Sequence, residues 1–202
     1  MFAHYHAVNI WGDPETRSGP GSRRDCLAVT HSLEMLSAFT KQYAIRSIAD
    51  IPCGDFNWMS AYLESHPGVD YTGFEIVPDL VENNRRMFPG RRFVHLDIVE
   101  SVPPQADLIF CKDLLNHLSG EEIVRAISNM RASGAKYLLA TNNFGYPGAN
   151  EELERSTAHN SRHVDLTVAP FNYPGALWNS HYLGLWSLAH MEQLPSSLVR
   201  MR

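Results

Sequence analysis

The sequence predicts an α/β fold with a doubly wound, mostly parallel sheet. From residue 47 to residue 141, short apolar segments typical of strands alternate with segments whose apolar residues recur at helical spacing. This order favours parallel strands, because a helix carries the chain back across the sheet before the next strand begins. Acidic or amide residues follow the expected strands, where ligands of such sheets bind. These residues are Asp55, Glu75, Asp97, Asp113 and Asn142.

Length and composition indicate one ordinary globular domain. The chain has 202 residues, of which 44% are hydrophobic and 19% charged. A net charge of −5 argues against a general nucleic-acid binder. We see no apolar run long enough to span a membrane and no signal peptide, so a cytoplasmic protein without a membrane partner is expected. The cysteines Cys26, Cys53 and Cys111 are widely spaced, which favours reduced thiols and no metal site.

Residues 1–24 form a polar, glycine- and proline-rich arm that we expect to be irregular. The arm is either a frayed tail or a lid that closes over a ligand, and the sequence leaves both open. Two residues favour the lid: Trp11 is costly to leave in water, and Arg17 lies in a glycine-rich stretch suited to an anion. His4 and His6 are expected to be surface histidines, since no further metal ligands are near them in sequence.

The regular elements follow from apolar spacing and from residues that start or stop helices. A helix over residues 25–43 is expected to begin with Asp25 as its N-cap. The helix over 78–88 has a proline in its first turn and stops at Pro89-Gly90. The other helices are expected at 59–65, 120–131 and 151–155, and the strands at 48–51, 70–75, 92–96, 107–111, 136–141 and 183–188.

The rest of the chain is organised around residues 47–56. A strand ends there in the turn Pro52-Cys53-Gly54, and a helical pattern follows. At such a turn the backbone can pass close to a ligand, which then faces the N–H groups of the helix start. Glu75 ends the next strand, and a carboxylate at that position suits the two hydroxyls of a ribose.

These residues carry a resemblance to the class I S-adenosylmethionine (SAM)-dependent methyltransferases. The first motif of that family is an acid followed by three alternating glycines, and Asp50-Ile-Pro-Cys-Gly-Asp-Phe56 overlays it. Gly54 matches one motif glycine, while Pro52 and Phe56 stand in place of the other two. The full phrase from Asp50 to Met59 resembles a bacterial subgroup of the family, which carries a similar stretch in the arm.

The resemblance implies a seven-stranded, Rossmann-like class I methyltransferase fold with an N-terminal arm and helix, in one domain over residues 1–202. It implies SAM as cofactor and S-adenosylhomocysteine (SAH) as product, with Asp97 near the adenine. The residues that it places at the cofactor are Trp11, Arg17, Asp50, Pro52, Cys53, Gly54, Asp55, Trp58, Glu75, Ile76, Asp97, Ile98 and Lys112.

A methyltransferase of this kind is expected to act on a small polar acceptor, foremost a hydroxyl of a sugar or secondary metabolite. A hydroxyl must lose a proton, and Asp113 and His117 are the candidate bases because residues at i and i+4 of a helical turn share a face. Alternatively, Asp113 binds SAM and His117 supports the turn. Asn142 and Asn143 follow the fifth strand where metal-dependent relatives carry acids, so no metal is expected.

In the family, the segment at 145–182 shapes the acceptor pocket, and its polar residues form either a site or a loop pinned by side-chain hydrogen bonds. These residues are His159, Asn160, Arg162, His163 and Asp165. Two other functions stay open. One is a nucleotide-binding oxidoreductase on a Rossmann sheet, although its glycine signature is absent; the other is a SAM-binding protein without turnover. We expect a monomer or homodimer with no nucleic-acid partner.

Overall fold

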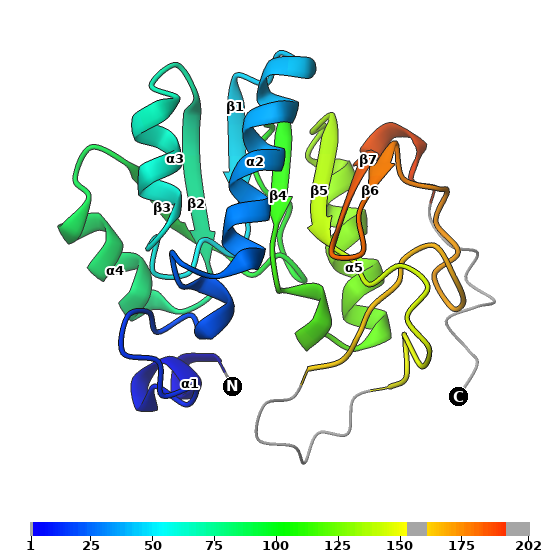
Figure 1. Cartoon of the computed structure of the whole chain (residues 1–202), viewed down its shortest axis with the longest axis horizontal. Helices are drawn as coiled ribbons and strands as arrows, with labels where there is room; N and C mark the ends of the chain where they lie inside the picture. The colour runs from blue at the N-terminus through cyan, green and yellow to red at the C-terminus, as the bar shows by residue number, and fades with distance from the viewer. Residues whose placement is uncertain (1, 153–160, 193–202) are drawn as a thin grey trace. The chain divides into compact units, whose positions relative to one another are not determined.

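The computed structural model describes residues 2–152 and 161–192. Its seven strands form a sheet in the order β3-β2-β1-β4-β5-β7-β6, and this confirms the predicted α/β class (Figure 1). The chain divides into two compact units, Met1–Asp97 and Ile98–Arg202, and each is described by itself below. In the described part of the chain, every helix is too short or too polar to cross a membrane.

Three parallel strands form the sheet of the first unit. β1 (Ser47–Asp50) pairs with β2 (Asp70–Glu75), which pairs with β3 (Arg92–His95). The crossovers are α3 (Met59–Ser65) and α4 (Pro78–Met87), so each strand returns to the same direction as predicted. The carboxyl ends of β1 and β2 therefore meet at one edge of this sheet, which brings the turn after β1 close to the end of β2.

The N-terminal part of the first unit differs from expectation at two points. Its arm begins with a helix, α1 (Phe2–Val8), and contains the short 3-10 helix η1 (Pro20–Ser22), so it is not wholly irregular. The helix expected at 25–43 is α2 (Leu27–Gln42), and its N-cap is Cys26, which makes no side-chain capping bond. Asp25 was the wrong cap because its carboxylate is held by the Arg23 guanidinium, at 2.9 and 3.0 Å.

An aromatic cluster at Phe56 stabilises the chain between β1 and α3. Phe56 has a φ of +58°, a left-handed conformation that costs a non-glycine residue about 1–3 kcal/mol. Its buried ring packs on Tyr71, Phe88 and Phe93, with centroid distances of 5.2, 4.8 and 5.1 Å. Burial of a phenylalanine contributes about 1.5–3 kcal/mol, enough to offset the backbone strain.

The second unit adds parallel and antiparallel strands. β4 (Leu108–Cys111) runs parallel to β5 (Tyr137–Thr141), while β7 (Leu183–Ser187) lies antiparallel between β5 and β6 (Trp178–Asn179). β6 and β7 therefore form an antiparallel pair at the end of an otherwise parallel sheet. All four residues of β4 are buried, as is typical of a strand covered on both faces.

Among the described residues of the second unit, the helices are one α-helix and two 3-10 helices. α5 (Gly120–Ala132) starts at a capping box, in which Ser119 and Glu122 satisfy each other's backbone N–H groups, and it buries Ile123, Ile127 and Met130. The 3-10 helices are η2 (Leu115–His117) and η3 (Leu188–His190). Of the helix expected at 151–155, residues 151 and 152 are irregular, and the remainder lies outside the described residues.

We expect Phe56→Ala to destabilise the protein by about 3–5 kcal/mol, because it empties the centre of the aromatic cluster. Urea unfolding followed by tryptophan fluorescence measures the change. Met87→Ala is the matched control, because Met87 is adjacent in sequence to Phe88 of the cluster but is itself 60% exposed. This variant should change the free energy of unfolding by about 0.5 kcal/mol or less. A loss below about 1 kcal/mol for Phe56→Ala would show that the cluster does not support this turn.

Candidate functional site

The turn after β1 has a backbone shape that requires a glycine at one position. Gly54 has a φ of +54°, and a Cβ atom placed on it would lie 2.4 Å from the Ser18 hydroxyl oxygen of the arm. Gly54, the one motif glycine that the sequence retains, is therefore required for two reasons. Its backbone is left-handed, and the arm approaches it too closely for a side chain. The two missing motif glycines are replaced by Pro52 and Phe56, and the ring of Phe56 anchors the turn in the core.

The carboxylate of Asp55 binds the arm to this turn. Its oxygens accept hydrogen bonds from the Thr16 hydroxyl at 2.7 Å, the Arg17 backbone N–H at 2.9 Å and the Ser18 hydroxyl at 3.2 Å. In return, the Asp55 N–H donates to Ser18 Oγ at 3.0 Å. Four bonds to one residue fix the middle of the arm beside Gly54, so this part of the arm is a docked element and not a frayed tail.

The turn is also held from the α4 side. The buried Asn84 donates from Nδ2 to the Gly54 carbonyl at 2.8 Å, while its Oδ1 is buried without a partner in the described structure. Gly73 on β2 makes room for Cys53, since a Cβ on Gly73 would lie 2.9 Å from the Cys53 side chain. Burial, and secondarily the charges of Asp50 and Glu75, raise the pKa of the Cys53 thiol well above its usual value, so this cysteine packs and does not act as a nucleophile.

Glu75 ends β2 with its carboxylate turned toward backbone N–H groups. Oε1 accepts from Ile76 N at 2.8 Å and Val77 N at 3.1 Å, and Oε2 accepts from Gly54 N at 3.2 Å. Burial raises the pKa of Glu75, although these three hydrogen bonds act in the opposite direction. Oε2 accepts this one hydrogen bond among the described residues, whereas a carboxylate oxygen can accept about two.

The other residues predicted at the cofactor take several positions. Asp50 is buried at the end of β1 and accepts from the Tyr71 hydroxyl at 2.7 Å, so it supports the strand end. Trp58 is buried before α3 and Asp97 is half-buried after β3. Trp11 packs against Gly19 within the arm. The structure thus gathers the predicted residues of the turn with Glu75, while Ile98 and Lys112 belong to the second unit.

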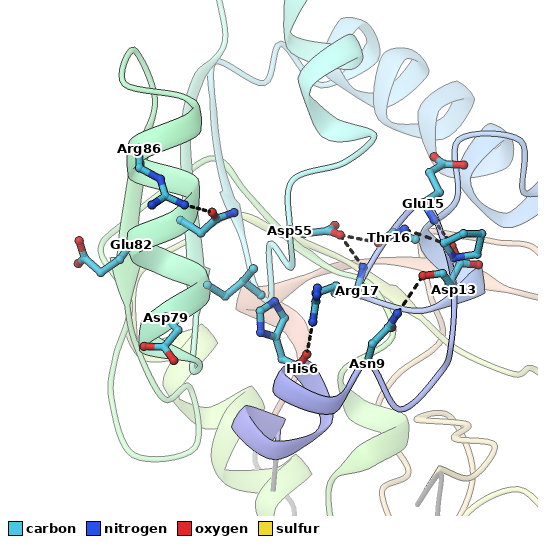
Figure 2. A pocket seen from close by; sticks show the side chains of 13 residues that line it. His6, Asn9, Asp13, Glu15, Thr16, Arg17, Asp55, Asp79, Glu82 and Arg86 are labelled. Atoms are coloured by element: carbon cyan, nitrogen blue, oxygen red, sulfur yellow. Dashed lines mark hydrogen bonds between the residues drawn. The ribbon is translucent and has the colours of Figure 1, made fainter.

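A cavity of about 840 Å³ lies in the first unit between the arm and α4 (Figure 2). Its lining includes His6, Arg17, Asp55 and Asp79 but neither Gly54 nor Glu75. On the arm side of this cavity, Arg17 Nη1 donates to the backbone carbonyl of His6, which is also an arm residue, at 3.2 Å (Figure 2). Burial, and secondarily the Arg17 charge, lower the pKa of His6, so the imidazole is neutral at pH 7.

In the second unit, the end of β4 carries a charged cluster. Asp113 has a φ of +55°, and its carboxylate binds the ammonium group of Lys112, whose side chain is only 5% exposed. The Thr141 hydroxyl donates to Oδ1 at 3.1 Å, and the Tyr182 hydroxyl lies 2.9 and 3.1 Å from the two carboxylate oxygens. Three segments of the unit, the ends of β4 and β5 and the start of β7, therefore meet at one partly exposed carboxylate.

The geometric reason for pairing Asp113 with His117 was wrong. Asp113 is left-handed, and the residues that follow form the 3-10 helix η2, so the two residues are not at i and i+4 of an α-helix. His117 lies beside Asn116, whose Nδ2 is 3.5 Å from His117 Nε2. His117 is half-buried, and its role as a base stays a prediction.

The segment after β5 is pinned by side-chain hydrogen bonds. Buried Asp165 accepts from the Asn142 amide, the Gly145 N–H, and the N–H and hydroxyl of Thr167, at 2.7–3.2 Å. Burial alone would raise the pKa of Asp165, but these four bonds together lower it. Of the predicted polar group, His159 and Asn160 lie outside the described residues. The contacts of Asp165 and those below match the interpretation of a pinned loop.

Arg162 and the asparagines after β5 serve the same loop. Arg162 donates to the carbonyls of Glu151 and Leu118, both at 2.9 Å. Asn142 and Asn143 accept the N–H groups of Leu166 and Val164 at 2.8 and 3.1 Å. In the described residues, no three side chains of the types His, Cys, Asp or Glu are grouped to hold a metal ion.

Four contacts of these sites were missed by sequence reasoning. Ser18 and Thr16 were seen only as parts of a glycine-rich arm, and nothing in their spacing pointed to Asp55, 37 and 39 residues away. Asn84 interrupts the apolar stripe of α4 as a buried polar residue, which was a usable signal. No signal in the sequence pointed to Tyr182, which is 69 residues from Asp113.

Comparisons with known proteins identify the fold. No protein-family model matches the sequence, and no curated protein matches it. Among solved structures, magnesium protoporphyrin IX methyltransferase (ChlM) from Synechocystis PCC 6803 with bound SAH is 13% identical, with a TM-score of 0.55 over 89% of this chain and 90% of that chain. PigF with SAH is 15% identical, with a TM-score of 0.55 over 79% and 58%.

The methyltransferase domain of bacterial CtHen1 is 12% identical, with a TM-score of 0.50 over 56% of this chain and 66% of that chain. The chain thus spans less than two thirds of PigF and of this domain, but nearly all of ChlM. At these identities the likeness shows a shared fold: the chain has the Rossmann-like fold of SAM-dependent methyltransferases, as the motif resemblance implied.

We expect Gly54→Ala to release the arm, because the new Cβ meets Ser18 and the left-handed backbone becomes strained. Limited proteolysis should then cut within residues 13–24 faster than in the wild type. Gly68→Ala, where nothing lies within 4 Å, is the control and should leave cleavage unchanged. If cleavage of the arm is as slow in Gly54→Ala as in the wild type, the arm is not held by this contact.

We expect Asp165→Asn to lower the free energy of unfolding at pH 7 by about 1.5–3 kcal/mol, since an amide cannot replace all the charge-assisted bonds. The carboxyl pKa is lower in the folded protein, so its contribution is present above the ordinary aspartate pKa and lost as pH falls through the folded value. Urea unfolding of both proteins from pH 7 downward should show the difference shrinking. A difference that is constant with pH contradicts the assignment.

Proposed function

We propose that this chain is a methyltransferase that binds SAM and transfers its methyl group to a small polar acceptor. The observation that carries the proposal is the pair formed by the turn at Gly54 and the carboxylate of Glu75, on a fold shared with ChlM, which is a methyltransferase with bound SAH. A dinucleotide would need the glycine-rich signature of oxidoreductases, and this turn instead carries Phe56 and a docked arm.

Three features of the first unit support the binding of SAM. Glu75 keeps one acceptor position on Oε2 at the end of β2, as a ribose hydroxyl requires. Ser18 lies against the Cα of Gly54, so arm and turn together present a polar, closely packed surface. Arg17 offers a guanidinium on the same arm, suited to a carboxylate. When bound, SAM supplies an electrophilic methyl group.

The acceptor is proposed to be a hydroxyl of a sugar or secondary metabolite, with Asp113 or His117 acting on its proton. Asp113 supports this proposal because its carboxylate is held rigidly by three neighbours and is still 35% exposed. Fixed orientation and partial exposure are what a base or a positioning group for the acceptor needs. The segment 145–182 is proposed to shape the acceptor side.

Calorimetric titration with SAM and, separately, with NAD tests the cofactor. Binding of SAM without binding of NAD is expected. Release of SAH with a mixed panel of hydroxyl acceptors then separates an active enzyme from a protein that binds SAM without turnover. Binding of NAD but not of SAM would contradict the proposed methyltransferase and favour a nucleotide-binding oxidoreductase.

We expect Glu75→Ala to weaken SAM binding by about 1.5–3 kcal/mol, the range for loss of a charged hydrogen-bond partner. Calorimetry measures the dissociation constant, and circular dichroism confirms that the variant is folded. Glu64→Ala, an exposed glutamate of α3, is the control and should bind SAM like the wild type. An unchanged dissociation constant for folded Glu75→Ala would refute the assignment.

A further inference from the structure

The three side chains that donate hydrogen bonds to Asp113 differ in whether they can also accept a hydrogen bond or a proton from a ligand. The Lys112 ammonium has donors and no lone pair, so it can stabilise the carboxylate but cannot take a proton from a ligand. Thr141 Oγ1 donates to the carboxylate and accepts the Asp113 N–H at 3.0 Å. The Tyr182 hydroxyl donates to the carboxylate and, as a phenol oxygen, can also accept a hydrogen bond.

Tyr182 also has the position that a proton carrier needs. Its hydroxyl lies within 3.1 Å of both carboxylate oxygens, so a proton leaving it reaches Asp113 without rearrangement. The Tyr182 side chain is half-buried, so part of it is in contact with solvent. The residue lies in the turn between β6 and β7, directly before the first residue of β7. The Lys112 ammonium lies 5.9 Å from the centre of the Tyr182 ring, a distance at which the ring face attracts a cation.

We propose that Tyr182 contacts the acceptor hydroxyl and relays its proton to Asp113; this deepens the proposed function and rests on it. The acceptor hydroxyl gives its proton to the Tyr182 oxygen as the phenol proton moves to the Asp113 carboxylate. The acceptor oxygen gains the methyl group as the methyl–sulfur bond breaks, and the sulfonium becomes the neutral thioether of SAH. Protons, charge and electron pairs balance, since the carboxylate becomes neutral as the sulfonium loses its charge.

The relay commits the acceptor to one chemical class. An alcohol holds its proton at neutral pH and gains most from a relay, whereas a neutral amine or a thiolate already presents a lone pair. We therefore infer that the acceptor is an alcohol, and the probes chosen to represent it are the methyl glycosides of common hexoses and deoxyhexoses.

The test compares the wild type with Tyr182→Phe, Asp113→Asn, the double variant and the control Tyr137→Phe. Tyr137 begins β5, at the opposite end of that strand from Thr141. Transfer of labelled methyl from SAM is measured to the glycosides, to benzylamine and to thiophenol. Calorimetry gives SAM affinity for each variant. In protein labelled with ¹³C-tyrosine and loaded with SAH, the Tyr182 signal, assigned by its absence in Tyr182→Phe, is followed as a glycoside is added.

The relay predicts transfer to at least one glycoside and a loss of about 10²-fold or more in kcat for Tyr182→Phe, at unchanged SAM affinity. Asp113→Asn should lose a similar factor and the double variant little more, because the two residues act as a unit. Tyr137→Phe should behave like the wild type. Addition of the glycoside should move the Tyr182 signal, which a purely structural tyrosine would not show.

Several results would overturn the relay while leaving SAM binding intact. One such result is a kcat of Tyr182→Phe within about threefold of the wild-type value. Others are methyl transfer to the amine or thiol but to no glycoside, and SAM binding without transfer to any probe. The last is an NMR signal of Tyr182 that does not move when the glycoside is added. A wild-type protein that does not bind SAM would instead overturn the proposed function itself.

Discussion

The candidate cofactor site depends on the hydrogen bonds that the arm donates to the Asp55 carboxylate. The turn after β1 is irregular, and its residues 54 and 56 are left-handed, so regular hydrogen bonding cannot hold it. Asp55 accepts three donors from the arm and so places Ser18 against Gly54. With Asn84 holding the Gly54 carbonyl, the Gly54 N–H points to Glu75. Gly54 therefore links Glu75 on one side to the docked arm on the other.

The same physical device recurs in the second unit. Irregular segments there are also organised by carboxylates, because an ionised oxygen can satisfy several buried donors at once. Asp165 fixes the chain after β5, and its donors are all local to that loop. Asp113 differs, since its partners come from distant segments and its carboxylate keeps contact with solvent. Of the two, Asp113 has the arrangement suited to chemistry and Asp165 the one suited to support.

The regular elements and the class of fold could be predicted from sequence because periodicity is a local property. Strand and helix ends fell within a residue or two of the structure wherever apolar spacing was clear, as for β2 and α3. The N-cap of α2 was mispredicted because Arg23 competes for Asp25. The turn at Asp113 was mispredicted because a left-handed residue interrupts the expected helical spacing to His117.

Long-range partners could not be predicted from one sequence. The motif around Gly54 identified the turn and Glu75, but the docking of the arm depends on contacts across 37 to 39 residues. The meeting of Tyr182 with Asp113 depends on the antiparallel pairing of β5 with β7, which places the start of β7 opposite the end of β5. Such contacts are properties of the folded sheet and leave no local pattern of spacing.

Hydrogen–deuterium exchange of the full chain with and without SAH tests whether the cofactor binds at the turn after β1, and it needs no acceptor. We expect SAH to slow exchange of the amides of residues 51–57 and 75–77 and of the arm residues 16–18, whereas NAD should have no such effect. Unchanged exchange in residues 51–57 and 75–77 at saturating SAH, or slowing confined to residues 161–175, would contradict it.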